Sequence, residues 1–310
     1  MGEERKIMKK KFVKRLMLTA LTIGVISGCG RQDELAETVV CFDTLVNTEG
    51  SIEITTEVEE TMVQTKSEPE ESNIYYKVEN PSWDYYYENE SVSGEEQTVF
   101  LEELDEIPNG ISDVNQWITD NKLDFQSMPY SDENYIYNTN GYNGFDTYEL
   151  QLQELFGEGR FITLDFSNYN YADDFVELER DFVFQRIIWA KAENGILYVA
   201  TGHYTYAASS PHNAYITAID LADYHVIWKT APLTCNSLSF EVIGDAIVCG
   251  YGFTNEDDYL YILDKKTGLV QESISLKKAP DYIYRQGDIL YVHTYDADLR
   301  FQITENERKE

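Results

Sequence analysis

Residues 259–268 read YLYILDKKTG, and this stretch decides the fold. Aromatic and aliphatic side chains alternate up to Leu263, which is typical of a β-strand. Asp264 then opens a turn, because its carboxylate can accept hydrogen bonds from the backbone that follows it. Gly268 can adopt the positive φ that closes a bulged hairpin. We therefore predict a strand followed by a tight hairpin turn, with Asp264, Thr267 and Gly268 as structural turn residues.

A strand of another type recurs on either side of this stretch. Gly195–Val199 reads GILYV, and related sequences follow at Asp245–Cys249 and at Asp288–Val292, at spacings of 50 and 43 residues. Each copy follows a turn signal such as Asn-Gly or Gly-Asp. A period of this length indicates a repeated supersecondary unit of a few strands.

The strand and turn at 259–268 also have an earlier copy. Residues Ala214–Leu221 read AYITAIDL, and Asp220 lies 44 positions before Asp264. Trp228 follows at the expected distance, but Tyr224 stands where the turn should have glycine. The last copy has no such turn.

These repeats resemble those of quinoprotein-type (PQQ-like) β-propellers, in which G-x-L-Y-V leads to Y-A-I-D-x-x-T-G-x-x-x-W. The resemblance covers roughly residues 187–304, with two good copies and one partial copy. It implies an all-β, propeller-like domain. Enzymatic members of that family are larger, with about eight blades, and carry a pair of adjacent cysteines beside their cofactor. This chain has neither the length nor the pair, so we expect no cofactor.

The length of the domain predicts the number of blades. Residues 75–310 number 236, which at about 40 to 50 residues per blade corresponds to about five blades. Residues 289–303 are too few for a blade, so we expect an N-terminal strand such as Tyr75–Val78 to complete it. A partial, open propeller or a β-sandwich is the alternative. One short helix is expected at 113–120, capped by Ser112, with Val114, Trp117 and Ile118 on one face.

The N-terminal residues predict export. Residues 1–15 are rich in Lys and Arg, and Leu16–Ile26 carries no charge, which is typical of a signal peptide. Eleven helical residues span only about 16 Å, too short for the roughly 30 Å core of a bilayer. Ile26-Ser27-Gly28-Cys29 resembles the lipobox of bacterial lipoproteins. That resemblance implies a lipid on Cys29 and an extracytoplasmic, membrane-anchored protein. An ordinary cleaved signal peptide beside a coincidental cysteine is the alternative.

Composition then divides the chain and limits its partners. We predict a signal peptide at 1–28, an acidic flexible tether at 29–74 and the propeller-like domain at 75–310. The chain has 56 acidic and 24 basic residues, for a net charge of −32, so nucleic acid is excluded as a partner. Cys235 and Cys249 can form a disulfide across neighbouring strands, but cysteines in strands are more often small apolar residues.

Few residues suggest a functional site. The connection at 204–213 is rich in hydroxyl groups and is the candidate ligand-contact loop, because loops on rigid scaffolds carry binding groups. No zinc motif, EF-hand loop or G-x-S-x-G motif occurs, so we expect no metal and name no catalytic residue. A plain polar turn is the alternative. The residues singled out in this loop are Tyr204, Tyr206, Ser209, Ser210, His212 and Asn213.

Three functions are compatible with these features. The first is a non-catalytic scaffold that binds an envelope protein. The second is a module that binds a carbohydrate, such as an envelope glycan, or another small solute, which an aromatic-lined pocket would favour. The third is an unrecognised hydrolase, which a clustered Asp/Glu pair with a raised pKa would favour.

Overall fold

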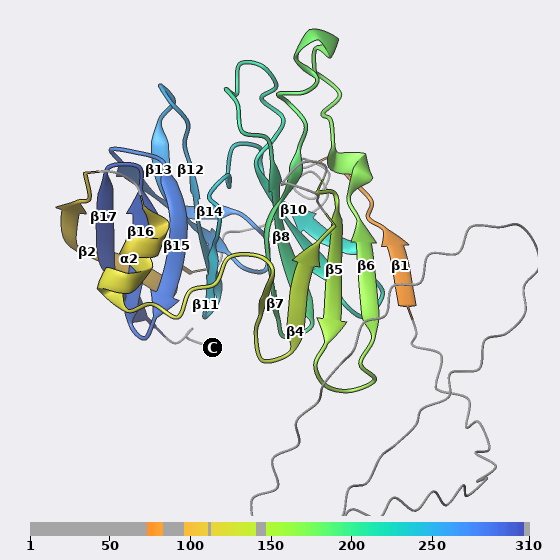
Figure 1. Cartoon of the computed structure of the whole chain (residues 1–310), viewed down its shortest axis with the longest axis horizontal. Coiled ribbons are helices and arrows are strands. Elements are labelled where there is room, and N and C mark those ends of the chain that lie inside the picture. The colour runs from red at the N-terminus through yellow and green to blue at the C-terminus, as the bar shows by residue number, and fades with distance from the viewer. Residues whose placement is uncertain (1–72, 83–95, 111–112, 141–146, 307–310) are drawn as a thin grey trace, which may run out of the picture. The chain divides into compact units, whose positions relative to one another are not determined.

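The computed structural model describes residues 73–82, 96–110, 113–140 and 147–306, which are almost entirely β-structure (Figure 1). The chain divides into the units Met1–Val63 and Gln64–Glu310, and every described residue belongs to the second. The expected signal peptide, Cys29 and nearly all of the tether lie outside the described residues. Within the described part, no helix is both long and apolar enough to span a membrane.

The described strands form four sheets. In each sheet, consecutive strands pair antiparallel, as in propeller blades. The first sheet contains β3 (Tyr130–Ser131), β4 (Tyr135–Thr139), β5 (Glu149–Glu154), β6 (Phe161–Asp165) and β1 (Asn73–Lys77), and the second contains β7 (Arg186–Glu193), β8 (Ile196–Gly202), β9 (Tyr215–Asp220) and β10 (Val226–Lys229). The third contains β11 (Glu241–Ile243), β12 (Ala246–Tyr251), β13 (Asp258–Asp264) and β14 (Val270–Leu276), and the fourth contains β15 (Pro280–Gln286), β16 (Ile289–Thr294), β17 (Ala297–Glu305) and β2 (Val99–Pro108).

The all-β, propeller-like fold is confirmed by this arrangement. The described residues form four sheets where chain length predicted about five. The difference arises because two long segments add no blade. One is the connection 166–185, which holds two short 3₁₀ helices, η1 (Ser167–Tyr169) and η2 (Glu177–Glu179), and the other is the segment 109–129, which holds helix α2 (Val114–Asn121).

An N-terminal strand completes the last sheet, but it is not the expected one. Strand β2 pairs antiparallel with β17 along its whole length, from Val99 opposite Glu305 to Pro108 opposite Ala297. The expectation for Tyr75–Val78 was wrong, because β1 instead runs parallel to β6 in the first sheet. Strand β2 has 10 residues and β17 has 9, whereas β1 has 5, so only β2 matches the length of the open edge.

Three apolar clusters hold successive sheets together in the described part. Strand β8 shows how one strand serves two of them. Leu197 and Val199 belong to the cluster between the first and second sheets, whereas Tyr198 and Ala200 point to the opposite face and join the cluster with the third sheet. This alternation follows from the two-residue period of a strand.

Helix α2 covers the remaining face of the fourth sheet (Figure 1). The ring of Trp117 lies 6.3 Å from Tyr282 and 5.3 Å from His293, measured between ring centroids. The helix begins with Asp113 as its cap, not the expected Ser112, because Asp113 Oδ1 accepts hydrogen bonds from the backbone N–H groups of Asn115 and Gln116 at 3.0 and 3.2 Å.

The turns after β9 and β13 share one geometry. Asp264 Oδ1 accepts hydrogen bonds from the backbone N–H groups of Lys266 and Thr267, both at 2.9 Å, and Gly268 has a φ of +71°. In the earlier copy Asp220 accepts from Ala222, and Tyr224 adopts a φ of +66°. Tyr224 thus keeps the conformation that glycine has at position 268.

The two cysteines that the structure describes, Cys235 and Cys249, are fully buried and not joined by a disulfide. The Cys249 thiol donates a hydrogen bond to the carbonyl of Thr234 at 3.5 Å. Both belong to the cluster between the second and third sheets. They therefore act as small apolar core residues, which was the more common role expected for cysteines in strands.

Candidate functional site

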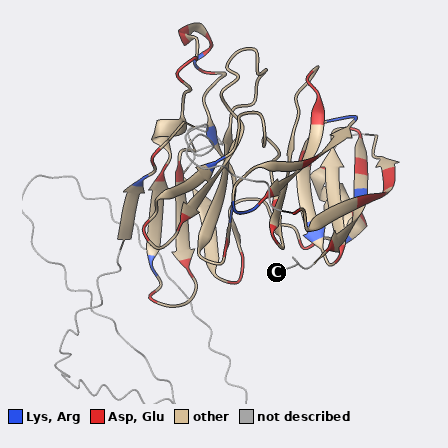
Figure 2. Ribbon diagram, turned by 180° about the vertical axis from the view of Figure 1, so that it is seen from behind, with Lys and Arg blue, Asp and Glu red and all other residues tan. Residues whose placement is uncertain are grey.

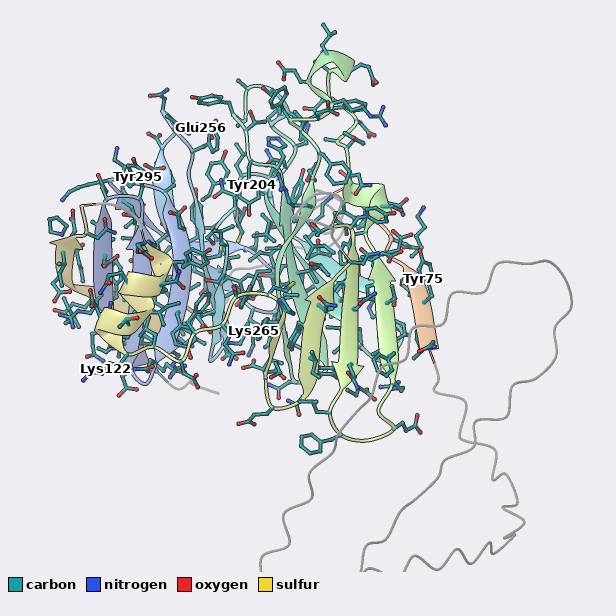
Figure 3. All side chains as sticks on the ribbon, viewed as in Figure 1. Tyr75, Lys122, Tyr204, Glu256, Lys265 and Tyr295 are labelled. Carbon is teal, nitrogen blue, oxygen red and sulfur yellow. The ribbon has the colours of Figure 1, made fainter. Side chains whose placement is uncertain are left out.

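Three connections meet at one end of the sheets and form what we call the loop face, which comprises residues 166–185, 203–214 and 252–257. The rings of Tyr206 and Phe253 lie 4.9 Å apart, and the backbone N–H of Ala207 donates to Glu256 at 2.7 Å. Ser210 donates to Asp174 at 3.2 Å. Glu256 and Tyr204 mark this end in Figure 3. The candidate loop at 204–213 is therefore the middle one of three connected loops.

The buried His203 fixes the conformation of the candidate loop. Its Nε2 lies 2.9 Å from the carbonyl of Ser210, and its Nδ1 accepts from the backbone N–H of Thr205 at 3.3 Å. These contacts require the neutral ring with its proton on Nε2. Burial lowers the pKa of His203, which favours the same neutral form. No motif in the sequence indicates that His203, rather than a residue inside the loop, has this role.

The six loop residues singled out in the sequence divide into two groups. Ser210 and Asn213 are buried, and Asn213 donates to the Ser210 carbonyl at 2.9 Å, so both stabilise the loop itself. Tyr204, Tyr206 and His212 are exposed, and Ser209 is half-buried. The guanidinium of Arg186 lies 4.7 Å from the ring centroid of Tyr204.

A pocket of about 660 Å³ opens beside this loop, and His212 is the only one of the six that lines it. The pocket extends to Asn80 and Asn168, next to the first sheet, and we call it the Lys229 pocket after the lysine in its lining. Lys229 ends β10 and is 5% exposed. Its ammonium lies 4.3 Å from the ring centroid of Tyr215 and 5.3 Å from that of Tyr169, and it donates to Asn80 Oδ1 at 2.6 Å.

Asp174 lies on another wall of the pocket and joins it to the candidate loop. Its two carboxylate oxygens contact His212 Nδ1 at 2.9 Å and Ser210 Oγ at 3.2 Å. A nucleophilic triad needs the histidine between the serine and the acid. Here the acid lies between the other two, so these three residues are not arranged as such a triad. Ser210 is also 1% exposed, so its hydroxyl is not presented to a substrate.

Two carboxylates outside the pocket have raised pKa values. Burial raises the pKa of both Asp258 and Asp281. Asp258 stands on β13 of the third sheet and Asp281 on β15 of the fourth. Neither lines the Lys229 pocket.

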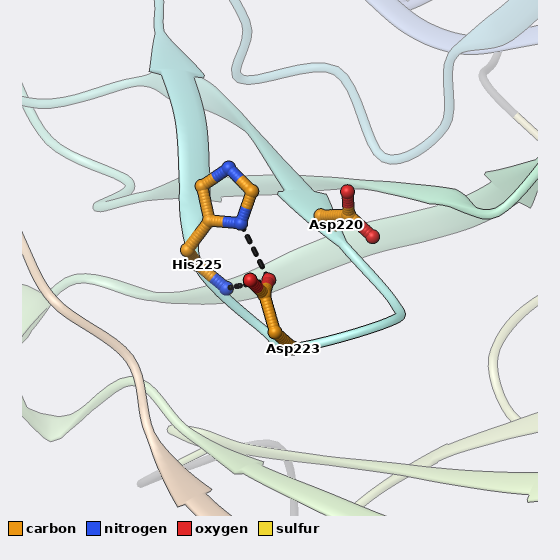
Figure 4. A group of neighbouring side chains, drawn as sticks. All are labelled: Asp220, Asp223 and His225. Carbon is orange, nitrogen blue, oxygen red and sulfur yellow. Dashed lines mark hydrogen bonds and ion pairs between the residues drawn. The ribbon is translucent and has the colours of Figure 1, made fainter.

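One group of side chains in the described residues has metal-ligand spacing (Figure 4). Ligand atoms of Asp220, Asp223 and His225 lie within 4.8 Å of one another. Asp220 already accepts from the turn backbone, and Asp223 accepts from both the ring and the backbone of His225. The contact with His225 lowers the pKa of Asp223. These hydrogen bonds lie within the turn after β9, so they explain the grouping of the three side chains as part of that turn.

No protein-family model matches the chain, and no curated protein does. Among solved structures, the chain is similar to BamB from Moraxella catarrhalis, with 12% identity, a TM-score of 0.32 and coverage of 58% of this chain and 59% of that one. It is also similar to the computationally designed Ika8 protein, with 7% identity, a TM-score of 0.24 and coverage of 53% and 60%. The chain spans about three fifths of the length of each.

Proposed function

We propose that this protein is a lipid-anchored, extracytoplasmic and non-catalytic scaffold that binds a protein partner through the loop face. The observation that carries the proposal is the tip of the connection 166–185. Val176, Leu178 and Phe182 are 52%, 93% and 68% exposed there. Burying a Leu or Phe side chain contributes about 1.5–3 kcal/mol, so an apolar tip of this kind favours an interface.

The tip is ordered by its own backbone. The N–H groups of Glu179 and Phe182 donate to the carbonyls of Val176 and Glu179, both at 2.8 Å. Val183, which follows directly, is buried in the domain. The partner therefore meets preformed apolar side chains, which reduces the entropy that binding costs.

Acidic residues surround the apolar tip (Figure 2). Charges at the rim of an interface steer association and select partners more than they add affinity. We infer a partner whose apolar cleft has a basic rim, which fits the overall charge of −32. The acidic side chains of the tip are Glu177, Glu179 and Asp181, and Arg180 between them pairs with Glu177.

Photocrosslinking in intact cells tests the scaffold. A photoreactive amino acid in place of Leu178 should give a discrete adduct that Phe182→Ser removes. Exposed substitutions of this kind change stability by about 0.5 kcal/mol or less, so an unchanged unfolding midpoint shows that the fold is intact. The matched control is the same amino acid at Val270, an apolar residue that is 45% exposed on the third sheet. No adduct at 178, or the same adduct at 270, would contradict the proposal.

Membrane fractionation tests the anchor. Cys29→Ala should release the protein from membranes, because two long acyl chains bind a bilayer firmly without a membrane-spanning segment. Cys41→Ala is the matched control and should leave the protein in the membrane fraction. Retention of the Cys29→Ala variant would show that the lipid anchor does not exist.

A further inference from the structure

The Lys229 pocket is built by two sheets. Tyr215 begins β9, Lys229 ends β10, and Tyr169 ends η1 directly after the first sheet. Tyr215 and Tyr169 are 5% and 2% exposed, and the Tyr169 hydroxyl donates to the carbonyl of Glu79 at 2.9 Å. Lys229 and its two rings therefore have fixed positions before any ligand arrives, as preorganised binding sites require.

The charges of the pocket favour a neutral ligand. The lining carries the carboxylates of Asp173 and Asp174 as well as the Lys229 ammonium, so neither an anion nor a cation would find walls of one charge. Sugar hydroxyl groups suit both walls, because each can donate to a carboxylate and accept from an ammonium or amide N–H. Amide side chains, which have the same dual character, complete the lining at Asn80, Asn168 and Gln185.

Gln185 supplies an independent sign that a hydrogen-bond donor is missing. The residue is 4% exposed, and its Nε2 donates to the carbonyl of His212 at 3.1 Å. Its Oε1 is buried and has no hydrogen-bond partner in the described structure. A buried acceptor without a donor is unfavourable. A ligand hydroxyl would supply that donor once the Gln185 amide turns toward the pocket.

The size of the pocket and one aromatic ring of its lining agree with a saccharide ligand. A volume of about 660 Å³ falls within the roughly 300–1,000 Å³ of small-molecule sites. The half-buried ring of Tyr171 provides apolar surface on the wall, whereas Tyr169 and Tyr215 are almost fully buried behind Lys229. Aromatic side chains of this kind pack against the C–H groups of a sugar while their hydroxyls reach polar groups. We propose that the Lys229 pocket binds a neutral saccharide.

Titration of the full chain with defined probes tests the proposal. The neutral probes are maltose, cellobiose and N,N′-diacetylchitobiose, with glucose 6-phosphate as the anionic probe and dialanine as the zwitterionic probe. Calorimetry and saturation-transfer NMR should detect at least one neutral disaccharide. Lys229→Met, which keeps most of the apolar stem, should weaken its binding tenfold or more. Asp174→Asn, a less buried change that keeps the side-chain size, should weaken it several-fold.

A matched lysine serves as the control. Lys265 is a partly buried lysine that does not line this pocket, and its ammonium lies 2.5 Å from the Glu193 carboxylate. Lys265→Met should therefore leave the affinity unchanged. The proposal is overturned if none of the neutral disaccharides binds to the folded protein. It is also overturned if Lys229→Met and Asp174→Asn both bind as tightly as the wild type, or if glucose 6-phosphate or dialanine binds more tightly than every neutral probe.

Discussion

Replacing Gly268 by alanine adds one methyl group at the turn that joins β13 to β14. Gly268 has a φ of +71°, and its N–H donates to the carbonyl of Asp264 at 2.8 Å. A Cβ at this position would lie 2.6 Å from Cε3 and 2.8 Å from Cζ3 of Trp228. Trp228 is 3% exposed and packs between the second and third sheets. The methyl group would therefore strain the turn and displace a core ring.

The magnitude is the sum of these two effects. An L-residue in the left-handed region costs about 1–2 kcal/mol, and forcing extra volume into a packed core costs about 1–3 kcal/mol. Gly268→Ala should therefore lower the free energy of unfolding by about 2–5 kcal/mol. Gly287 has a similar φ of +64°, but no heavy atom of the described structure would lie within 4 Å of its Cβ. Gly287→Ala should cost only about 1–2 kcal/mol.

Urea unfolding followed by far-UV circular dichroism measures both variants against the wild type. The difference between Gly268→Ala and Gly287→Ala isolates the contact with Trp228, because both share the backbone strain. If the two variants lose the same stability, the inferred contact between the turn and the Trp228 ring is wrong.

Three further predictions concern a strained tyrosine, a buried histidine and the buried thiols. Tyr224→Gly should relieve about 1–2 kcal/mol of strain but lose a buried aromatic side chain typically worth about 3–5 kcal/mol, so urea unfolding should show net destabilisation. A stabilised variant would mean that strain dominates there. Because burial lowers the pKa of His203, its contribution to stability is complete above about pH 6.5 and is lost as the pH falls through the lowered pKa. His203→Gln should flatten this part of the stability profile, measured by urea unfolding between pH 7.5 and 5, and an unchanged slope would refute the assignment. Cys235 and Cys249 are fully buried, and burial raises the pKa of the Cys249 thiol. Iodoacetamide should therefore modify both cysteines only in urea, which peptide mass spectrometry can check. Labelling of the native protein would contradict their burial.

The strands that sequence could predict are those specified by nearby residues. The stretch 259–268 matches β13 and the turn that follows it, because period-two alternation and an Asp-to-Gly turn act within ten residues. The repeats at 195, 245 and 288 fall on β8, β12 and β16 for the same reason.

The role of β2 could not be predicted in this way. Its sequence VFLEELDEIP carries several carboxylates, which indicate a solvated segment rather than part of a sheet. Its pairing depends on β17, almost two hundred positions away, where Arg300 Nε donates to Asp105 Oδ1 at 2.8 Å. That ion pair lowers the pKa of Asp105. A single sequence does not reveal which distant cation accompanies such a carboxylate.

The candidate site was predicted in part for a similar reason. The hydroxyl-rich composition of residues 204–213 suggested a ligand site. In the structure, His203 and Asn213 both donate hydrogen bonds to the Ser210 carbonyl, so part of this polar composition stabilises the loop itself. Lys229 reads as an ordinary charged residue after Trp228. Its burial depends on Asn80 and Tyr169, which the first sheet brings from distant positions.

The connection 166–185 carries the apolar tip and also forms part of the Lys229 pocket. The way its two ends are held explains how one segment can have both roles. Phe166 and Tyr169 belong to the cluster between the first and second sheets, and Val183 is 1% exposed at the other end. The fold therefore fixes where the connection leaves and re-enters the domain. Between these anchors, Asp174 faces the pocket while Leu178 is left to solvent. Rigid sheets that hold the ends of a long loop are what binding loops require, so one segment can present an apolar contact to a protein and a polar wall to a small ligand.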